Sequence, residues 1–403
     1  MWWWIPLRSL WRNRRRALLS VAIISLGSAL SFFVLGFLDS ARAQIVASSV
    51  DEYGNFQVAS PLLWNDDADG YEYLLTPERA ETVRSIVAND PAYVGSTVQL
   101  QFPALLAAGD RTQVIRVTAL EPGNGILDFS EVVERGRALE ATDVAALLIG
   151  RSLADRLSID VGDVVTVTLT TVDGAYNASP FQIVGVFTFP SEQVELQTVV
   201  APLRFGQLLL ATDGVDRIVV SLDEIAATEV SRSRVQRRLD AEGSALEART
   251  WNELSPIYEQ LSSYFDLLFG FLSLAISVLV FFIILQVLTL AFLERTREIG
   301  TLRALGTTQS EVFRLFFSES GWLAVLGSGV GIAAGAVLGL GFNALKLQWL
   351  PPGTVEETTL SVRIGWSTAL VPFIVSFVAT VLSALYPALQ AARLQIVDAL
   401  RVE

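Results

Sequence analysis

The stretch Leu267–Leu293, LLFGFLSLAISVLVFFIILQVLTLAFL, contains no charged side chain. As a helix it is long enough to cross a hydrocarbon core about 30 Å thick, which takes about 20 apolar residues. Three further charge-free stretches have a similar length, namely Ala17–Leu38, Ser320–Leu345 and Ile364–Ala392. Because four such stretches are unusual in a soluble protein, the sequence predicts a membrane protein with four transmembrane α-helices.

Arginines beside these stretches predict how the chain is oriented. They cluster before the first stretch and between the second and third, at Arg8, Arg12, Arg14, Arg15, Arg16, Arg295, Arg297, Arg303 and Arg314. Short loops rich in arginine and lysine stay in the cytoplasm. We therefore expect cytoplasmic N- and C-termini, and a large domain outside the membrane between the first and second helices. A small-x-small sequence at Ala41–Ala43 also permits signal cleavage, but the apolar run before it is longer than a signal peptide requires.

The expected organisation is one helix, an outer domain and then three helices. The first 16 residues place tryptophans and arginines on opposite faces, which is typical of a basic amphipathic helix at the inner membrane surface. An ordinary aromatic belt that leads into the first span is the alternative. The expected segments are 1–16 (amphipathic helix), 17–38 (first span), 39–264 (outer domain ending in a stalk), 265–293 (second span), 294–319 (cytoplasmic helix and loop), 320–345 (third span), 346–363 (outer loop), 364–392 (fourth span) and 393–403 (cytoplasmic tail).

Charge is distributed unevenly along the chain, whose formal net charge is -13. The segment 39–259 holds 33 acidic and 16 basic residues, which gives -17, and the remaining 9 acidic and 13 basic residues give +4. The acidity therefore belongs to the outer domain. Because a surface that binds phosphates needs the opposite sign, we expect no nucleic-acid partner.

Missing residue types exclude whole classes of chemistry. The sequence has no histidine and no cysteine, and Lys346 is its single lysine. These absences exclude a Ser/His/Asp relay, a thiolate metal cluster and a disulfide. A phosphate-binding loop needs lysine followed by Ser or Thr, whereas Leu347 follows Lys346. We therefore expect no catalytic residue, no metal site and no cofactor in this chain, which we interpret as a non-enzymatic subunit.

The outer domain alternates between strand-like and helix-like segments, which predicts an α+β fold. Thr76 followed by Pro77 predicts a helix over 77–89. Strands are expected at 113–120, 163–172, 182–189, 198–202 and 217–222, and helices at 205–211 and 224–242. The acidic residues Asp66, Asp67 and Asp69 do not form an EF-hand, because the required Glu at the twelfth position is missing, and we expect a solvated loop.

A short helical corner is expected after the second span. Ile299, Leu302 and Leu305 fall on one side of a helix that Gly306 would end. Thr308 and Glu311 have the spacing of a capping box, which would start the next helix. On these grounds alone, docking on a cytoplasmic partner and a plain solvated connection both remain open.

In the third span, Gly327, Gly331, Gly335 and Gly339 recur every four residues. They form three overlapping GxxxG units, a smooth ridge that lets another helix approach closely. The pattern does not say whether that helix belongs to the same chain. Gln286 in the second span is expected to be a buried polar group that makes a packing hydrogen bond, with a place in a substrate path as the alternative. Pro372 and Pro387 in the fourth span are expected to kink or end the helix.

Four segments resemble the ABC transporter permeases of the FtsX/MacB/LolC-E type. Residues 294–306, ERTREIGTLRALG, resemble the family signature ERxREIGxLRAxGA, and residues 386–401 resemble its C-terminal PAxxAAxxxPxxAL, with Gln395-Ile396 where proline is common. Within the outer domain, residues 148–163 resemble iGxxLAxxLgxxvGD. Residues 251–256 resemble the Trp-x-x-Leu-x-Pro that precedes the second span in lipoprotein-release members.

The resemblance implies a mechanism and a set of partners. A separate cytoplasmic ABC ATPase dimer would hold ATP and Mg, and two permease copies, identical or homologous, would sit in the bacterial inner membrane among its lipids. The resemblance implies that the helix from Arg297 to Leu305 is the ATPase-coupling helix. Its site residues would be Arg297, Glu298, Ile299, Leu302, Arg303, Leu305 and the following Gly306. Mechanotransmission, the transfer of ATP-driven movement to the outer domain, would extract or export a lipoprotein or another lipophilic substrate. Drug or peptide efflux through a tripartite pump and FtsX-like regulation of a cell-wall hydrolase remain alternatives.

Overall fold

The computed structural model describes residues 14–64, 70–123, 129–189, 192–294, 296–349 and 358–393. The chain divides into two compact units. We call the first the helical unit, which comprises Met1–Gln44, Leu261–Gln348 and Thr359–Glu403. The second, the sheet unit, comprises Ile45–Gln260 and Trp349–Thr358. The acidic triplet Asp66, Asp67 and Asp69, the first 13 residues and the last ten lie outside the described residues.

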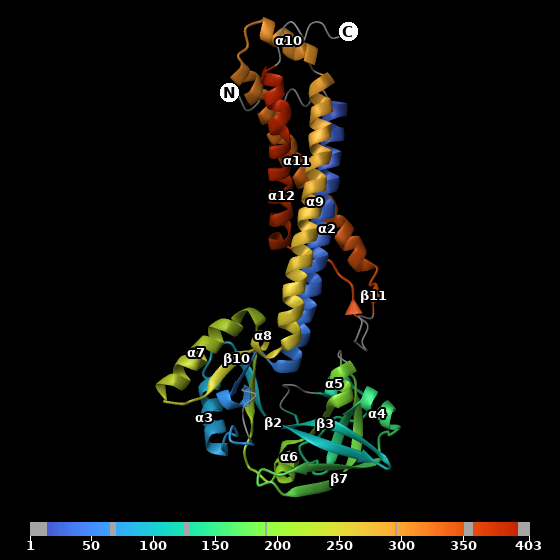
Figure 1. Cartoon of the computed structure of the whole chain (residues 1–403), viewed down its shortest axis with the longest axis vertical. Helices are drawn as coiled ribbons and strands as arrows, with labels where there is room; N and C mark the ends of the chain where they lie inside the picture. Colours follow the sequence, from blue (N-terminus) through green and yellow to red (C-terminus); the bar gives the residue numbers. More distant parts are fainter. Residues whose placement is uncertain are drawn as a thin grey trace. The chain divides into compact units, whose positions relative to one another are not determined.

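Four long helices carry the apolar stretches, and they confirm the one-plus-three order expected from sequence (Figure 1). They are α2 (Arg14–Tyr53), α9 (Pro256–Glu294), α11 (Gln309–Ala344) and α12 (Trp366–Arg393). Pro372 and Pro387 both lie inside α12, which continues through them. Neighbouring helices in a membrane bundle can accommodate such prolines.

Two of these helices extend well past their apolar stretches. The α2 helix continues from Asp39 to Tyr53, because no glycine or proline interrupts it before Gly54. Gly54 has φ of +71°, a left-handed conformation that ends helices and favours glycine. The α9 helix begins at Pro256, where the missing backbone N–H leaves no intrahelical hydrogen bond unmade. The last residues of α2, 45–53, and the first residues of α9, 256–260, therefore belong to the sheet unit.

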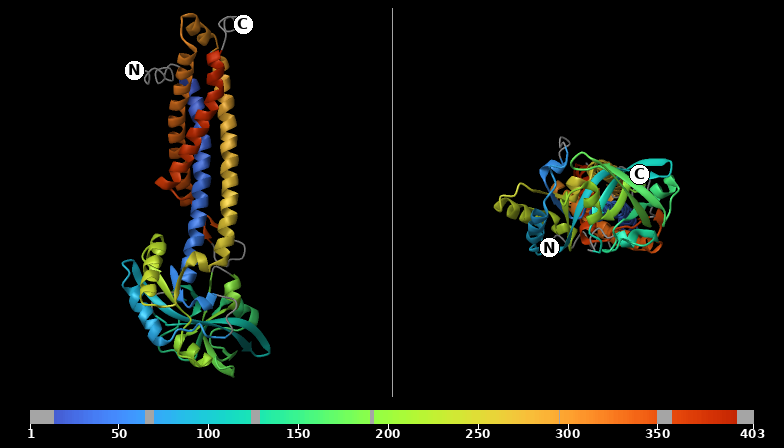
Figure 2. Two further views of the ribbon diagram at one scale, coloured as in Figure 1. Left: turned by 60° about the vertical axis from the view of Figure 1, so that its left-hand side comes forward. Right: turned by 90° about the horizontal axis from the view of Figure 1, so that it is seen from below.

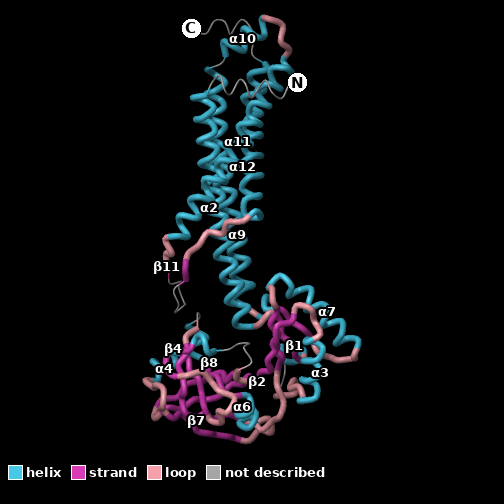
Figure 3. The backbone as a smooth tube through the Cα atoms, turned by 180° about the vertical axis from the view of Figure 1, so that it is seen from behind, coloured by secondary structure: helices cyan, strands magenta, loops and turns pink. Residues whose placement is uncertain are grey.

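The sheet unit has α+β structure, as expected, and its strands are drawn in magenta in Figure 3. Its ten strands are β1 (Phe56–Ala59), β2 (Tyr93–Ala108), β3 (Arg111–Leu120), β4 (Val133–Gly136), β5 (Ala146–Gly150), β6 (Val164–Thr170), β7 (Tyr176–Phe187), β8 (Thr198–Pro202), β9 (Arg217–Leu222) and β10 (Glu247–Thr250). Its helices are α3 (Pro77–Ala88), α4 (Arg151–Leu157), α5 (Glu192–Gln197), α6 (Leu203–Leu210), α7 (Thr228–Ala241) and α8 (Trp251–Leu254). A further strand pair joins β11 (Gln348–Trp349) to β12 (Thr358–Thr359).

Six of these strands close into a barrel, which the sequence did not predict. The strand β2 pairs with β3, β3 with β8, β8 with β5, β5 with β7, β7 with β6, and β6 returns to β2. The interior is apolar because alternate side chains of each strand point inward. In β6, for example, Val165, Val167 and Leu169 are buried, which confirms the alternation expected for this strand.

A second hydrophobic core lies on the other side of β2. Here the sheet order is β10-β1-β9-β2, and helices α3 and α7 pack on it through residues such as Val83, Val87 and Val235. The 16-residue strand β2 belongs to both parts: Tyr93–Gln99 pairs with β9, and Leu105–Ala107 pairs with β6. The sheet unit thus has two lobes that share one strand.

The remaining sequence-based expectations for this unit are largely confirmed. Thr76 accepts a hydrogen bond from the backbone N–H of Arg79 and caps α3. The strands β8 and β9 occupy the expected residues, β7 begins six residues earlier, and α7 begins after a 3-10 turn at Ile225–Ala227. The sequence missed β2, because Gly95 and Pro103 interrupt its alternation. Residues 100–104, which include Pro103, pair with β3 alone. The backbone N–H that proline lacks is tolerated there, because this part of β2 has a strand on one side only.

Candidate functional site: a helical corner and a glycine ridge

The corner after α9 is built as the sequence predicted. The helix α10 (Thr296–Ala304) ends where the N–H of Leu305 bonds the carbonyl of Thr301 and the N–H of Gly306 bonds that of Arg303. Gly306 has φ of +100°, a conformation that strains other residues. Only four residues, 305–308, therefore separate α10 from α11 (Gln309–Ala344).

A capping box fixes the start of α11. The backbone N–H of Thr308 donates to Glu311 Oε2 at 2.9 Å, and the backbone N–H of Glu311 donates back to Thr308 Oγ1 at 3.4 Å. Two backbone donors at the helix start are satisfied in this way. The capping box confirms the expectation from sequence and makes the corner a defined structure.

The apolar side chains of the corner divide between two environments. Ile299 is 1% exposed and packs with Val312 and Phe316 of α11. Leu305, by contrast, is 85% exposed. Ile299 and Leu305 therefore differ in burial, because α11 packs over Ile299, whereas Leu305 follows the end of α10 at Ala304. Arg303 is half-buried, and the side chains of Arg297, Glu298 and Leu302 lie outside the described part of the corner.

The glycine ridge on α11 packs against α2 of the same chain. A Cβ added to Gly327 would lie 2.6 Å from side-chain atoms of Ile24, and one added to Gly331 would lie 2.5 Å from the backbone oxygen of Ser25. A Cβ added to Gly335 would lie 2.9 Å from the ring of Phe32 and 3.0 Å from the backbone oxygen of Ala29. Gly339 is looser, with Val362 and Ile364 at 3.3 Å. Three of the four glycines are therefore needed for close contact between α2 and α11.

Serine hydroxyls stabilise this contact. Ser25 Oγ donates to the carbonyl of Gly327 at 3.0 Å, and Ser28 Oγ donates to the carbonyl of Ser328 at 3.3 Å. Hydrogen bonds between membrane helices add modestly to their association. Small residues on both helices, together with these bonds, lock α2 and α11 into one register.

The helix α9 packs on the side of α2 that carries Gly27, and the two ribbons lie side by side (Figure 2). Val280 would clash with any side chain at Gly27, since its Cγ2 lies 2.7 Å from an added Cβ. On the same face, Ile284 and Leu288 are buried together with Leu323 of α11. Gln286 is exposed, so the expectation that this glutamine is buried and hydrogen-bonded is wrong: the packed face of α9 runs through Val280, Ile284 and Leu288 instead.

Within the sheet unit, one asparagine connects the end of α2 to the strands and to the segment before α9. Asn55, directly after the turn at Gly54, is 1% exposed. Its side-chain oxygen accepts from the N–H of Leu222 at 2.8 Å, and its amide donates to Thr228 Oγ1 at 3.0 Å. Its backbone carbonyl accepts from the N–H of Trp251, the first residue of α8, at 3.2 Å. Asn55 therefore connects the end of α2 to β9, α7 and the segment that leads into α9.

A buried ion pair lies between the two lobes. Asp216 is fully buried and accepts hydrogen bonds from the backbone N–H of Gln101 at 3.2 Å and from Arg217 at 2.8 Å. Burial, and then the charge of Asp216, raise the pKa of Tyr73 to about 12. Tyr73 therefore stays protonated at any physiological pH, and we assign this cluster a structural role.

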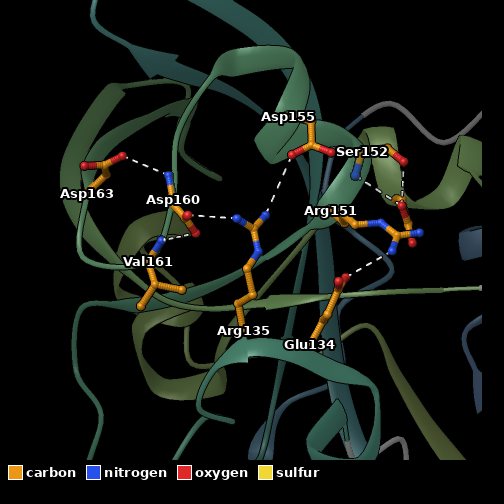
Figure 4. Close-up of polar contacts among 9 residues, drawn as sticks. Glu134, Arg135, Arg151, Ser152, Asp155, Asp160, Val161 and Asp163 are labelled. Atoms are coloured by element: carbon orange, nitrogen blue, oxygen red, sulfur yellow. Dashed lines mark hydrogen bonds and ion pairs between the residues drawn. The ribbon is translucent and has the colours of Figure 1, made fainter.

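The segment 148–163 forms β5, the short helix α4 and the turn into β6. Figure 4 shows Arg135 between Asp155 and Asp160, with nearest distances of 3.7 and 2.8 Å. These pairs are exposed and contribute little to stability. Among the described residues no group of acidic side chains is arranged to hold a metal ion.

Glu195 supports this segment from within the barrel lobe. It is fully buried, and its carboxylate accepts from the backbone N–H and hydroxyl of Ser152, at 3.1 and 2.5 Å, and from the N–H of Phe189 at 2.7 Å. All three donors therefore depend on one acidic side chain. Both of its oxygens are used, so that the position requires a carboxylate.

We predict that Glu195→Gln destabilises the barrel lobe by roughly 1–3 kcal/mol, because an amide N–H₂ would then face a backbone donor. Glu192, exposed on the same helix, provides the matched control, and Glu192→Gln should change little. Hydrogen exchange of the β5 and β8 amides in the whole protein measures the effect. Equal exchange in the two variants would contradict the assignment.

Two protein families match this chain. The family described as MacB-like periplasmic core domain matches residues 17–238, and the family described as FtsX-like permease C-terminal matches residues 270–396. The first match covers α2 and most of the sheet unit, and the second covers α9 to α12. Together they include the corner, the ridge and Asn55.

Curated relatives include permeases from archaea and bacteria. An ABC transporter permease of Methanocaldococcus jannaschii is 27% identical over 289 residues, which is 67% of this chain and 66% of that protein. The lipoprotein-releasing system transmembrane protein LolC of Xylella fastidiosa is 24% identical over 338 residues, or 79% of this chain and 80% of LolC. The macrolide export ATP-binding/permease protein MacB of Brucella abortus is 29% identical over 225 residues, which is 53% of this chain and 32% of MacB.

Solved structures similar to this chain include the extracytoplasmic domains of two transporters. The periplasmic region of MacB from Actinobacillus actinomycetemcomitans is 11% identical and covers 52% of this chain and 95% of that one, with a TM-score of 0.36. The extracellular domain of YknZ from Gram-positive bacteria is 14% identical and covers 49% of this chain and 100% of that one, with a TM-score of 0.35.

Proposed function

Since this chain belongs to the ABC transporter permeases that join a MacB-like periplasmic core domain to an FtsX-like C-terminal region, we propose that it couples ATP hydrolysis by a separate ATPase to work on an exported lipophilic substrate. The assembly would contain an ATPase dimer and a second permease, with both termini of this chain in the cytoplasm of the cell. A lipoprotein is the substrate class that we favour.

The observation that carries the proposal is Leu305. It is a large apolar side chain, 85% exposed, at the end of a helix whose position is fixed on one side by Ile299 and on the other by the capping box of α11. An exposed leucine on a rigid corner is typical of an anchor that fills a pocket on a partner. In the orientation predicted by the arginines, that partner would be in the cytoplasm, where the ATPase binds.

The packing of the helices supports mechanical coupling. The corner leads directly into α11, α11 is locked to α2 along the glycine ridge, and α2 continues without a break to Asn55 in the sheet unit. A displacement of the corner would therefore move packed helices as units. No step in this sequence requires a nucleotide site in the chain itself.

The lipoprotein proposal rests on the relatives. LolC, named for lipoprotein release, aligns along 79% of this chain and 80% of its own length. Drug efflux is the second candidate, favoured by the MacB-like core domain and the shorter match to MacB. Regulation of a cell-wall hydrolase, the third possibility raised by the sequence, has no comparable observation in its favour.

We predict that Leu305→Asp abolishes stimulation of the partner ATPase by the permease. Loss of an anchor residue typically costs 2 kcal/mol or more, which weakens binding by about thirtyfold or more. The measurement is ATP hydrolysis in nanodiscs as a function of permease concentration. Leu305→Met should retain stimulation, and Gln309→Asp tests the effect of adding the same charge at a neighbouring exposed position. Full stimulation by Leu305→Asp would disprove the coupling assignment.

A transport assay separates the two substrate classes. Proteoliposomes that contain the permease and its ATPase would be loaded with a fluorescent triacylated lipoprotein, and ATP-dependent release to a soluble acceptor would be measured. We expect release with the unmodified chain and none with Leu305→Asp. ATP-dependent macrolide transport without lipoprotein release would instead favour efflux.

A further inference from the structure

A short segment before α12 lies along residues 36–44 of α2. We call residues 359–363 the strap; they begin in β12 and lead towards α12 (Figure 3). Every second strap residue hydrogen-bonds α2, each time one helical turn further along. The three pairs are the N–H of Arg363 with the carbonyl of Gly36 at 2.9 Å, the hydroxyls of Ser361 and Ser40 at 2.5 Å, and the carbonyl of Thr359 with the side-chain amide of Gln44 at 2.9 Å.

The spacing of these pairs shows that the strap follows the axis of α2. Residue numbers fall by two in the strap for each rise of four in the helix, so the two segments run antiparallel. Four residues of helix advance about 6 Å, and two residues of extended chain advance about 6.6 Å. The strap therefore stays in register with α2 over two helical turns, and its alternate residues meet a single stripe of the helix.

One strap residue fills the space between α2 and α11. Val362 is 1% exposed, and its Cγ1 lies 2.8 Å from a Cβ added to Gly36 and 3.3 Å from one added to Gly339. Asn343, in the last turn of α11, holds Val362 by both backbone groups. The N–H of Val362 donates to Asn343 Oδ1 at 2.7 Å, and Asn343 Nδ2 donates to the carbonyl of Val362 at 2.9 Å. At this end of the glycine ridge, the strap therefore replaces direct contact between the two helices.

The strap meets α2 where the apolar stretch of that helix ends. The stretch ends at Leu38, and Asp39 is the first charged residue after it. The carboxylate of Asp39 accepts a hydrogen bond from Thr368 Oγ1 of α12 at 3.4 Å and lies 3.6 Å from Arg363 Nη1. The next residues of α2, 45–53, belong to the sheet unit. Both α11 and α12 thus bind the last turns of α2 within the helical unit.

We propose that the strap is the attachment through which α11 and α12 move the outer part of α2, and that it stays closed while the substrate is transported. This inference rests on the proposed function, in which movement of the corner reaches the sheet unit. The ridge fixes α2 from Gly327 to Gly335 of α11, whereas residues 36–44 are fixed through the strap. Without the strap, α2 would bend between the ridge and residues 45–53, and less of the displacement would reach the sheet unit. Asn343 and Val362 are therefore positioning residues that act through α2.

Cysteine crosslinking tests whether the strap stays closed, because the chain has no native cysteine. The Oγ atoms of Ser40 and Ser361 lie 2.5 Å apart, and two bonded sulfurs are about 2 Å apart. Ser40→Cys combined with Ser361→Cys should therefore form a disulfide within one chain under mild oxidation. The oxidised protein should release the fluorescent lipoprotein as fast as the reduced protein, and each single cysteine variant is a control. Failure to form the disulfide, or release that is lost on oxidation and restored by reduction, would overturn the proposal.

Opening the strap from the side of α11 tests its role in coupling. Asn343→Ala removes both hydrogen bonds that hold Val362. ATPase stimulation should persist, because the corner is unchanged, whereas ATP-dependent release of lipoprotein should be lost. Gln348→Ala, which changes an exposed amide in the same outer loop, is the matched control and should retain both activities.

A second variant opens the strap from the side of α2, so that misfolding of one variant does not decide the result. A Cβ added to Gly36 would lie 2.9 Å from the carbonyl oxygen of Arg363, so Gly36→Leu should displace the strap. Its matched control is Gly341→Leu, because no neighbouring atom among the described residues lies within 4 Å of a Cβ added to Gly341. Release should be lost in the first variant and kept in the second, with ATPase stimulation in both.

Hydrogen exchange of the strap provides a measurement that does not depend on ATP. The amide of Arg363 is bonded to Gly36 and exchanges when the strap opens. Asn343→Ala should make this exchange about threefold to tenfold faster for each hydrogen bond that is lost. The control variants Gln348→Ala and Gly341→Leu should leave it unchanged. Equal exchange in Asn343→Ala and the unmodified chain would show that Asn343 does not hold the strap.

The possible results distinguish the strap from the proposed function. Normal release by both Asn343→Ala and Gly36→Leu, with normal ATPase stimulation, would overturn the strap and leave the proposed function intact. Loss of stimulation together with release in a folded variant would show a general structural role and would also overturn it. An unmodified chain that neither stimulates an ATPase nor releases lipoprotein would refute the proposed function, and with it the role of the strap in transport. Crosslinking and exchange would then still decide whether the strap holds α2.

Discussion

Gly331→Leu is expected to destroy the packing of the helical unit. A Cβ at this position would lie 2.5 Å from the backbone oxygen of Ser25 and 2.6 Å from Ser28 Cβ, so α2 would have to move away from α11. Where neighbouring side chains can move to make room, overpacking costs about 1–3 kcal/mol. Because backbone atoms are involved here, we expect a loss above about 3 kcal/mol and little folded protein.

Gly329→Leu is the matched control for this experiment. Gly329 lies on the same helix two residues earlier, and no neighbouring atom lies within 4 Å of an added Cβ. The control should insert and remain folded, since the new side chain faces outward. Thermal stability of the detergent-solubilised protein, followed by size-exclusion chromatography after heating, measures the difference. Equal melting temperatures for the two variants would mean that α2 and α11 are not packed along the ridge.

Asn55→Ala is expected to destabilise the sheet unit by roughly 2–4 kcal/mol. The substitution leaves the buried N–H of Leu222 without an acceptor and removes the bond to Thr228. It also opens a small cavity next to the turn at Gly54. Since each 1.4 kcal/mol is a factor of ten, amides of β1 and β9 that exchange by unfolding of this unit should exchange at least tenfold faster.

Asn89→Ala provides the comparison for Asn55. Asn89 is exposed, and its amide bonds only the carbonyl of Ser85 at 2.8 Å. The change should be within about 0.5 kcal/mol, which is typical of surface substitutions. Hydrogen exchange of both variants in nanodiscs allows the comparison in the complete protein. If β1 and β9 exchange at the same rate in both variants, Asn55 does not connect α2 to the sheet.

Features that depend on local sequence were predictable. Charge-free stretches identified the four spans because a membrane sets a minimum helix length. Gly306 and the Thr308–Glu311 pair identified the corner because caps and positive φ are encoded by one or two residues. The apolar side chains at every second position, Val165, Val167 and Leu169, identified β6, because successive residues of a strand face opposite sides.

Features that depend on tertiary contacts were not predictable from one sequence. The ridge indicated close approach, but Ser25 and Ser28, which it contacts, have no distinctive pattern in α2. Barrel closure escaped detection because β2 contains Gly95 and Pro103 and pairs with three strands along its length. The tendency of a segment to form a strand depends on its own residues, whereas its pairing partners depend on the whole sheet.

Side-chain environments were the least predictable part of the candidate site. The sequence placed Ile299 and Leu305 on one helix face, yet α11 covers only the first of them. It also treated Gln286 as buried because polar groups in membrane helices usually are. In both cases the helix was assigned correctly, but which face packs depends on the neighbouring helices. Leu305 was named from the sequence, but its 85% exposure came only from the structure.

The pairing of β1 with β10 has a consequence for the mechanical coupling proposed above. The strand β1 follows α2, and β10 leads into α8 and α9. Phe56, the first residue of β1, pairs with Thr250, the last residue of β10, so the chain enters and leaves this strand pair at the same end. Separating the two helices would break the hydrogen bonds between these strands one after another, beginning with the bond between Trp251 and Asn55. Moving the helices together puts no such load on the hydrogen bonds between β1 and β10. Under the proposed function, we therefore expect the two long helices to move together.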